Sequence, residues 1–226
     1  MFALPLFLTY QALTLLSPPG ATGAVRNGAD VLLQELSFRI AGPRGPLLLL
    51  VCLMGIGVWL VVRDLRANRR DLRAPVFGLM LAEAVGLALV FGVIVSAVTS
   101  GLVRPAAMML QAPVSALGFG TRLMLSLGAG LYEELLFRVL LVGTFAWAGR
   151  RLLGLRPLVA GLVAALFGAV IFSAFHYVGP YGDPFGVYSF VFRTIAGLAF
   201  SALFLLRGFG ITAWTHALYD AFLLLR

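Results

Sequence analysis

The stretch Leu131-Tyr-Glu-Glu-Leu-Leu-Phe-Arg138, LYEELLFR, lies inside a largely apolar run, residues 119–148, that is long enough to cross a lipid bilayer. It places two adjacent carboxylates and an arginine within the expected span. A charged side chain at the centre of a membrane helix costs roughly 2.5–3.5 kcal/mol on insertion. These groups must therefore pair with other polar groups or line a water-containing cavity, and the default interpretation is a functional site.

The composition of the whole chain is that of an integral membrane protein. Of its 226 residues, 61% are hydrophobic and only 12% are charged, and the mean hydropathy is +1.01. A soluble domain could not bury so much apolar surface. The apolar runs are continuous and about twenty residues long, whereas barrel strands are shorter and alternate apolar with polar residues. We therefore expect an all-α fold, a polytopic membrane helical bundle with about seven transmembrane helices.

Pro, Gly and Arg residues separate the expected spans. The first span is short and could instead be a signal peptide, but no basic segment precedes it, which favours a retained helix. The ionisable residues within spans gather in the later ones. We therefore expect accessory N-terminal helices over residues 1–118, with a connection at 20–44, and a catalytic core over residues 119–226. The expected spans are 2–17, 45–62, 75–102, 119–148, 158–178, 185–206 and 209–225.

The net charge of +8 comes from arginine, since the chain contains no lysine. The arginines gather in the connections after the second and fourth spans, so we interpret them as cytoplasmic topology determinants and expect no nucleic-acid partner. Seven spans then give a cytoplasmic N-terminus, and we expect the bacterial inner (plasma) membrane. Cys52 lies within a span and is expected to be a small buried hydrophobe. The loop arginines are Arg63, Arg66, Arg69, Arg70, Arg73, Arg150, Arg151 and Arg156.

The fourth span contains an acidic pair whose two members have different partners available. Glu134 and Arg138 are four residues apart, share one helix face and can form an ion pair. Glu133 is rotated by about 100° from Glu134 and lacks that arginine as a partner. Glu133 is therefore the better candidate for chemistry, and Arg138 is expected to hold Glu134 in place.

Two further spans contribute histidines. His176 ends the fifth expected span, and His216 and Asp220 share one face of the last span. With Glu133 as a general base, such a set suits water activation and oxyanion stabilisation, so hydrolysis is the simplest chemistry. The residues lie at different expected depths, so convergence requires tilted, kinked or unequal helices. Glycines that would permit this are Gly128, Gly130 and Gly168.

The cofactor stays open at this point. No HExxH, GxSxG or Walker-type glycine loop occurs in the sequence. Glu133, His176 and His216 could form a His2Glu site, a ligand set that suits zinc and leaves one position open for water. The alternatives are therefore no cofactor, with glutamate-activated water, or a divalent metal such as zinc.

Three motifs in this order resemble those of a known family: Glu133-Glu134-x-x-x-Arg138, Phe172-x-x-x-His176 and His216-x-x-x-Asp220. The family is the CAAX protease and bacteriocin-processing family of intramembrane proteases, which includes the type II CAAX prenyl endopeptidases. The resemblance covers roughly residues 119–225. It implies an intramembrane endopeptidase, of glutamate or metallo type, that acts on a membrane-associated protein or peptide.

The resemblance also implies roles for these residues. Glu133 and His176 would activate the attacking water, and His216 and Asp220 would stabilise the oxyanion. The prenyl endopeptidases usually have asparagine in the last position, so Asp220 would either be protonated or orient His216. The supporting residues would be Glu134, Arg138 and Phe172.

Two other classes of function fit parts of the pattern. One is a non-catalytic membrane scaffold or immunity protein that keeps the fold for partner binding. The other is a proton-coupled transporter, in which Glu83 would join Glu133, Glu134 and the two histidines in a relay. The acidic residues cluster in one half of the chain and no inverted repeat is visible, which disfavours the transporter.

Overall fold

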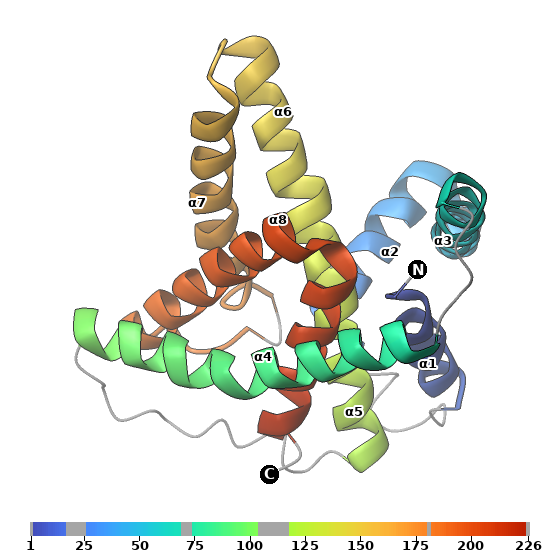
Figure 1. Ribbon diagram of the computed structural model, residues 1–226, viewed down its shortest axis with the longest axis horizontal. Coiled ribbons are helices and arrows are strands. Elements are labelled where there is room, and N and C mark those ends of the chain that lie inside the picture. Colours follow the sequence, from blue (N-terminus) through green and yellow to red (C-terminus); the bar gives the residue numbers. More distant parts are fainter. Residues whose placement is uncertain (1, 17–25, 69–73, 104–117, 180–181, 225–226) are drawn as a thin grey trace.

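A computed structural model describes residues 2–16, 26–68, 74–103, 118–179 and 182–224. Across these residues the chain is helical, with no strand (Figure 1), which confirms the expected all-α class. The elements are α1 (Leu4–Leu16), α2 (Gly28–Ala41), η1 (Gly42–Arg44), α3 (Gly45–Asn68), α4 (Ala74–Leu102), α5 (Phe119–Gly128), η3 (Ala129–Glu133), η4 (Leu135–Val142), α6 (Gly143–Leu152), α7 (Pro157–Phe175) and α8 (Val187–Leu224).

Long apolar helices and their lipid-like surface identify an integral membrane protein. In the described part of the chain, four segments are long and apolar enough to span a bilayer: Gly28–Arg66, Pro75–Leu102, Pro157–Phe175 and Val187–Leu224. Large apolar side chains on them are exposed, including Leu79, Leu89 and Leu162, which suits contact with lipid. The expected number of seven spans is not confirmed, and Cys52, which was expected to be buried, is exposed on the apolar helix α3. Arg69, Arg70 and Arg73, on which the topology partly depends, lie outside the described residues.

The N-terminal region differs from expectation in one respect. Residues 20–44 were expected to connect two spans, but α2 occupies Gly28–Ala41 within them. The Asn27 side chain caps this helix, because its oxygen accepts a hydrogen bond from the backbone N–H of Ala29. Together with α1, α2 packs against α5 and η3 in one core that includes Leu6, Leu33 and Leu131.

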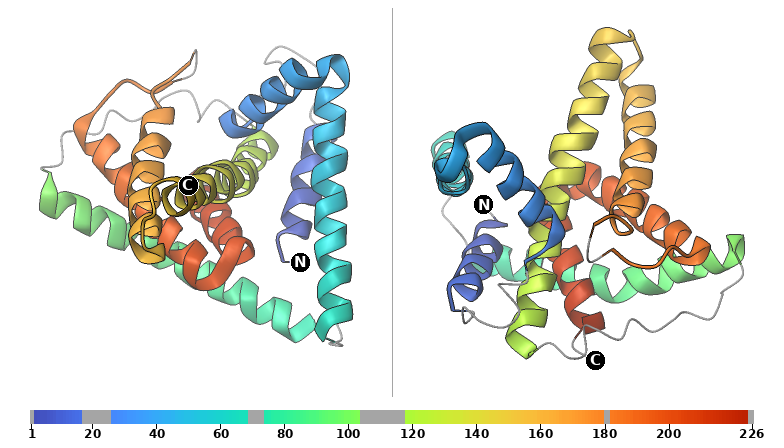
Figure 2. Two further views of the ribbon diagram at one scale, coloured as in Figure 1. Left: turned by 90° about the horizontal axis from the view of Figure 1, so that it is seen from above. Right: turned by 180° about the vertical axis from the view of Figure 1, so that it is seen from behind.

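The span that contains LYEELLFR is one long helix over residues 119–152, composed of α5, η3, η4 and α6 (Figure 1). Its middle is wound as π-helix over Ala129–Glu133 and Leu135–Val142. Such turns are rare in α-helices and are frequent at functional sites. The far end of the helix forms a hairpin with α7 that projects from the rest of the molecule (Figure 2).

The last two expected spans form a single bent element, α8. The bend is at Gly208, whose φ of +78° and ψ of 174° interrupt the helix. Glycine adopts this backbone conformation without the steric cost that a side chain would add. The first limb of α8 packs against α4 and α7, while the second limb returns beside α5 and brings His216 into the interior (Figure 1).

Candidate active site

The acidic pair is buried and its second member is neutralised by arginine. Glu134 is fully buried and Arg138 is 1% exposed. The Glu134 Oε2 and Arg138 Nε atoms are 3.1 Å apart, as the four-residue spacing predicts. The contact is an ion pair without an aligned hydrogen bond, since neither atom has a hydrogen-bond partner among the described residues. The guanidinium lies 4.5 Å from the ring centre of Phe172 and 5.4 Å from that of Phe200, so aromatic faces cover it.

His216 lies among three carboxyl groups. Its Nδ1 atom is 2.7 Å from Oε1 of Glu134, a hydrogen bond that fixes the ring. Its Nε2 atom faces the other two acids, at 3.7 Å from Oδ2 of Asp220 and 4.0 Å from Oε2 of Glu133. Phe200 stacks on the imidazole with ring centres 4.3 Å apart. The structure therefore brings Glu133, Glu134, His216 and Asp220 together.

Glu133 has a partner that the sequence did not suggest. The side-chain amide of Asn27 donates a hydrogen bond to Oε1 of Glu133, at 2.8 Å. Asn27 precedes an apolar stretch and so resembles a helix cap, which was the available signal for α2. Nothing in the spacing linked it to Glu133, because the two residues are 106 positions apart. The other Glu133 oxygen, Oε2, is the one that faces His216.

His176 joins the cluster from the end of α7. Its Nδ1 atom lies 2.9 Å from the backbone carbonyl oxygen of Phe172. A carbonyl can only accept, so Nδ1 carries the hydrogen and Nε2 of the neutral ring has a free lone pair. Burial lowers the pKa of His176, which lies just beyond the α7 span, and the Glu133 carboxylate opposes that shift. The Phe172 ring lies beside both histidines, with its centre 4.9 Å from the ring centre of His176 and 6.3 Å from that of His216.

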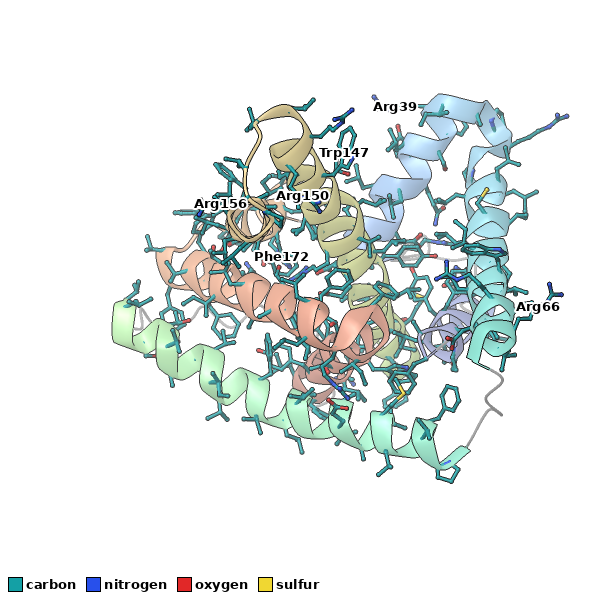
Figure 3. All side chains as sticks on the ribbon, turned by 45° about the horizontal axis from the view of Figure 1, so that its top comes forward. Arg39, Arg66, Trp147, Arg150, Arg156 and Phe172 are labelled. Atoms are coloured by element: carbon teal, nitrogen blue, oxygen red, sulfur yellow. The ribbon has the colours of Figure 1, made fainter. Side chains whose placement is uncertain are left out.

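Close helix contacts explain how residues from different expected depths converge. A Cβ atom at Gly130 would overlap the α8 backbone at Ala213 and Ala217, so only glycine lets η3 and α8 approach this closely. Gly128 lies against Tyr10 in the same way. Gly168 lies against Val142 and brings α7 close to the same long helix. All three glycines that the sequence singled out lie at such contacts, and the bend in α8 adds to them. Figure 3 shows Phe172 near the middle of the view and Arg39 and Arg66 at its edge, and the arginines Arg150 and Arg156 are exposed.

The proposed ligand set does not fit a metal in this arrangement. No group of three or more His, Cys, Asp or Glu side chains among the described residues is placed to hold an ion. We therefore derive no catalytic step through a metal.

The remaining ionisable residues within the spans pair elsewhere. Arg207, in the bend of α8, forms two hydrogen bonds of 2.6 Å with the carboxylate of Glu83 on α4. Arg193 pairs with Asp183 in the segment before α8. The pairing with Arg207 therefore compensates the charge of Glu83 away from the cluster around Glu133.

Comparison with known proteins finds a matching family for the C-terminal part of the chain. Residues 115–222 match the model of a protein family described as type II CAAX prenyl endopeptidase Rce1-like. The resemblance to the CAAX protease family is confirmed. The Rce1-like segment contains all three motifs, from Glu133 to Asp220, and supports a membrane-embedded peptidase. Asn27 lies outside it. No curated protein matches the chain, and no solved structure does.

Proposed function

We propose that the protein is an intramembrane endopeptidase that hydrolyses peptide bonds of membrane-associated proteins or peptides with glutamate-activated water. The observation that supports this most is the buried cluster in which Nε2 of His216 lies 4.0 Å from Glu133 and 3.7 Å from Asp220, across two helices. His176 interacts electrostatically with Glu133 from a third helix. Peptide hydrolysis needs a general base, a group that accepts a hydrogen bond from the attacking water, and a group that donates a hydrogen bond to the oxyanion.

In this proposal Glu133 and His176 share the attacking water. The lone pair on Nε2 of neutral His176 accepts one hydrogen of the water, which orients its oxygen toward the peptide carbonyl carbon. Oε2 of Glu133 takes the other proton as the oxygen attacks. Glu133 then passes this proton to the leaving amine nitrogen, so the carboxylate is regenerated when the peptide bond breaks.

His216 and Asp220 face the developing oxyanion. A protonated His216 donates from Nδ1 to Glu134 and presents its Nε2–H to the negative oxygen. The 3.7 Å separation between this nitrogen and Asp220 leaves Asp220 without a direct hydrogen bond to it. We therefore assign the orientation of His216 to Glu134, whereas Asp220, when protonated, donates a second hydrogen bond to the oxyanion. Of the two roles expected for Asp220, this proposal keeps the protonated donor and gives the orientation of His216 to Glu134.

The decisive experiment uses purified protein in liposomes with two sets of fluorescence-quenched peptides, one set transmembrane and one farnesylated at a C-terminal CAAX sequence. Loss of a general base lowers the rate by about 10²–10⁴-fold, so Glu133→Gln and His176→Asn should abolish detectable cleavage. Glu35→Gln is the matched control, because Glu35 is an exposed glutamate that pairs with the exposed Arg39. Full cleavage by Glu133→Gln would contradict the proposal, as would failure of the wild-type protein on both peptide sets.

A non-catalytic scaffold or immunity protein is the second candidate, because a complete set of motifs does not establish turnover. It predicts that Glu133→Gln keeps full biological function in cells. The proton-coupled transporter has less support, since Glu83 pairs with Arg207 at the surface of the molecule. Substrate-dependent proton flux into liposomes would favour it.

We also propose the bacterial inner membrane as the location, with the N-terminus in the cytoplasm. The support is the arginine pattern of the connections. A reporter enzyme that is active on only one side of the membrane, fused before Met1, tests this orientation directly. Activity on the outer side would contradict it.

A further inference from the structure

We propose that Asn27 is a positioning residue of the active site, so that the N-terminal helices α1 and α2 complete it. Asn27 would hold the Glu133 carboxylate in the orientation in which Oε2 faces the substrate. The inference builds on the endopeptidase function proposed above. It concerns a residue outside the Rce1-like segment, 115–222, and outside all three motifs.

The Asn27 side chain is fixed at both of its polar atoms. Its oxygen accepts from the backbone N–H of Ala29 at 2.9 Å, and its nitrogen donates to Oε1 of Glu133 at 2.8 Å. A carboxylate cannot donate and a backbone N–H cannot accept, so the amide has one possible orientation. Asn27 is 8% exposed and Glu133 is 7% exposed, which keeps competing water from this hydrogen bond.

The start of α2 is held in place by a separate polar network. Asp30 is buried and accepts a hydrogen bond of 2.6 Å from the Tyr10 hydroxyl on α1. Arg26 lies 3.1 Å from the same carboxylate. These contacts lie on both sides of Asn27 in the sequence and anchor the first turn of α2. The cap can therefore direct its amide at Glu133 with little freedom to move away.

The long helix is shaped to receive this end of α2. A Cβ atom at Gly128 would come within 2.9 Å of Cβ of Asn27 and within 2.7 Å of the Tyr10 ring, so glycine permits the approach. The neighbour of Glu133, Tyr132, accepts a hydrogen bond of 2.8 Å from Gln11 on α1. Contacts at Gly128 and Tyr132, which both precede Glu133, therefore join this part of the long helix to the N-terminal helices.

The two Glu133 oxygens have different roles because of this hydrogen bond. Oε1 is occupied by the Asn27 amide, and Oε2 lies 4.0 Å from Nε2 of His216. Without the amide, the carboxylate can rotate about its last bond and present either oxygen to either side. Catalytic groups lose efficiency when their geometry is not held, so turnover should fall while substrate binding does not.

Two substitutions separate the hydrogen bond from the helix cap. Serine is as good a cap as asparagine but has no amide for Glu133, so Asn27→Ser should keep α2 and lose the contact. Asn27→Asp keeps the cap and the size, and it replaces the donor with a like charge. Ser37→Ala, a polar deletion elsewhere in α2, is the control, because Ser37 contacts only the backbone oxygen of Gln34 in the described hydrogen bonds.

Turnover provides the first measurement, with the peptide that the wild-type protein cleaves best. Losing a hydrogen bond to a charged group should lower kcat about 10- to 100-fold in Asn27→Ser, with KM unchanged. Asn27→Asp should lower kcat further, and Ser37→Ala should have the kcat of the wild type. If Asn27→Ser kept the wild-type kcat while Glu133→Gln was inactive, the positioning role would be wrong and the endopeptidase function would stand.

Infrared spectroscopy provides a measurement that does not depend on cleavage. In protein with ¹³C-labelled glutamate side chains, the carboxylate band that Glu133→Gln removes belongs to Glu133. That band should shift in Asn27→Ser and in Asn27→Asp but not in Ser37→Ala. An unshifted band in Asn27→Ser would overturn the inference. If the wild-type protein cleaves no peptide, the endopeptidase proposal fails, and the band still decides whether Asn27 holds Glu133.

Discussion

Replacing Gly130 with alanine should force the glutamate helix away from α8. An added Cβ atom would lie 2.6 Å from both Cβ and the backbone nitrogen of Ala217, and it would overlap the carbonyl oxygen of Ala213. Two of these atoms belong to the α8 backbone, which cannot turn aside as a flexible side chain can. Overpacking of this kind costs about 1–3 kcal/mol of the free energy of unfolding.

Gly161→Ala on α7 is the matched control, because nothing lies within 4 Å of a Cβ atom added there. Alanine at an open helical position is favoured over glycine by about 0.5–1 kcal/mol. The two variants carry the same chemical change but should differ by about 1.5–4 kcal/mol in unfolding free energy, with Gly130→Ala below the wild type and Gly161→Ala equal to it or above.

Unfolding in mixed micelles of increasing SDS fraction, followed by tryptophan fluorescence, measures this difference. Cleavage of the best peptide provides the second measurement. A displacement of about 1 Å at a reacting group can cost on the order of 100-fold in rate, and Gly130 lies three residues before Glu133. Gly130→Ala should therefore lose activity even at temperatures where it stays folded. If Gly130→Ala matched Gly161→Ala in both measurements, the close packing of η3 on α8 would be refuted.

Arg138→Ala should lower the unfolding free energy by about 3–5 kcal/mol, because it removes the arginine that compensates the charge of the buried Glu134 carboxylate, whereas Arg39→Ala breaks an exposed pair and should cost under about 1 kcal/mol in the same assay. Burial lowers the pKa of His176, so the unfolded chain binds its proton first. Stability should thus fall as the pH drops below about 6.5, and His176→Asn should flatten this dependence in melts from pH 7.5 to 5. Glu83→Gln should leave peptide cleavage unchanged, whereas a proton relay through Glu83 would lose its transport.

The features that the sequence could predict are those that one helix contains by itself. The four-residue spacings of Glu134 with Arg138 and of His216 with Asp220 place each pair on one helix face, and both pairs are close in the structure. Continuous apolar runs likewise predict helices in a membrane. A helical period depends on the chain near each residue, so it needs no knowledge of the neighbouring helices.

The features that were missed come from contacts between elements distant in the sequence. Glu134 bonds His216 across 82 positions, and Asn27 bonds Glu133 across 106. The helical period of a sequence gives no information about a pairing between two distant helices. The helix α2 was missed for a related reason. Its polar residues are typical of a connection between spans: Asp30, Gln34, Glu35 and Arg39. In the structure Tyr10 and Arg26 pair with Asp30, and the sequence does not show the contact with the distant Tyr10.

The two adjacent glutamates differ in how their charge is compensated, and this difference decides which one can act as a base. Glu134 contacts a guanidinium and an imidazole, so taking a proton would break two favourable charge interactions in a dry interior. Glu133 receives one neutral amide and otherwise faces His216 at 4.0 Å, so it can take and release a proton without breaking an ion pair with arginine. Because neighbouring residues on a helix point in different directions, one short stretch can hold a structural carboxylate and a reactive one side by side.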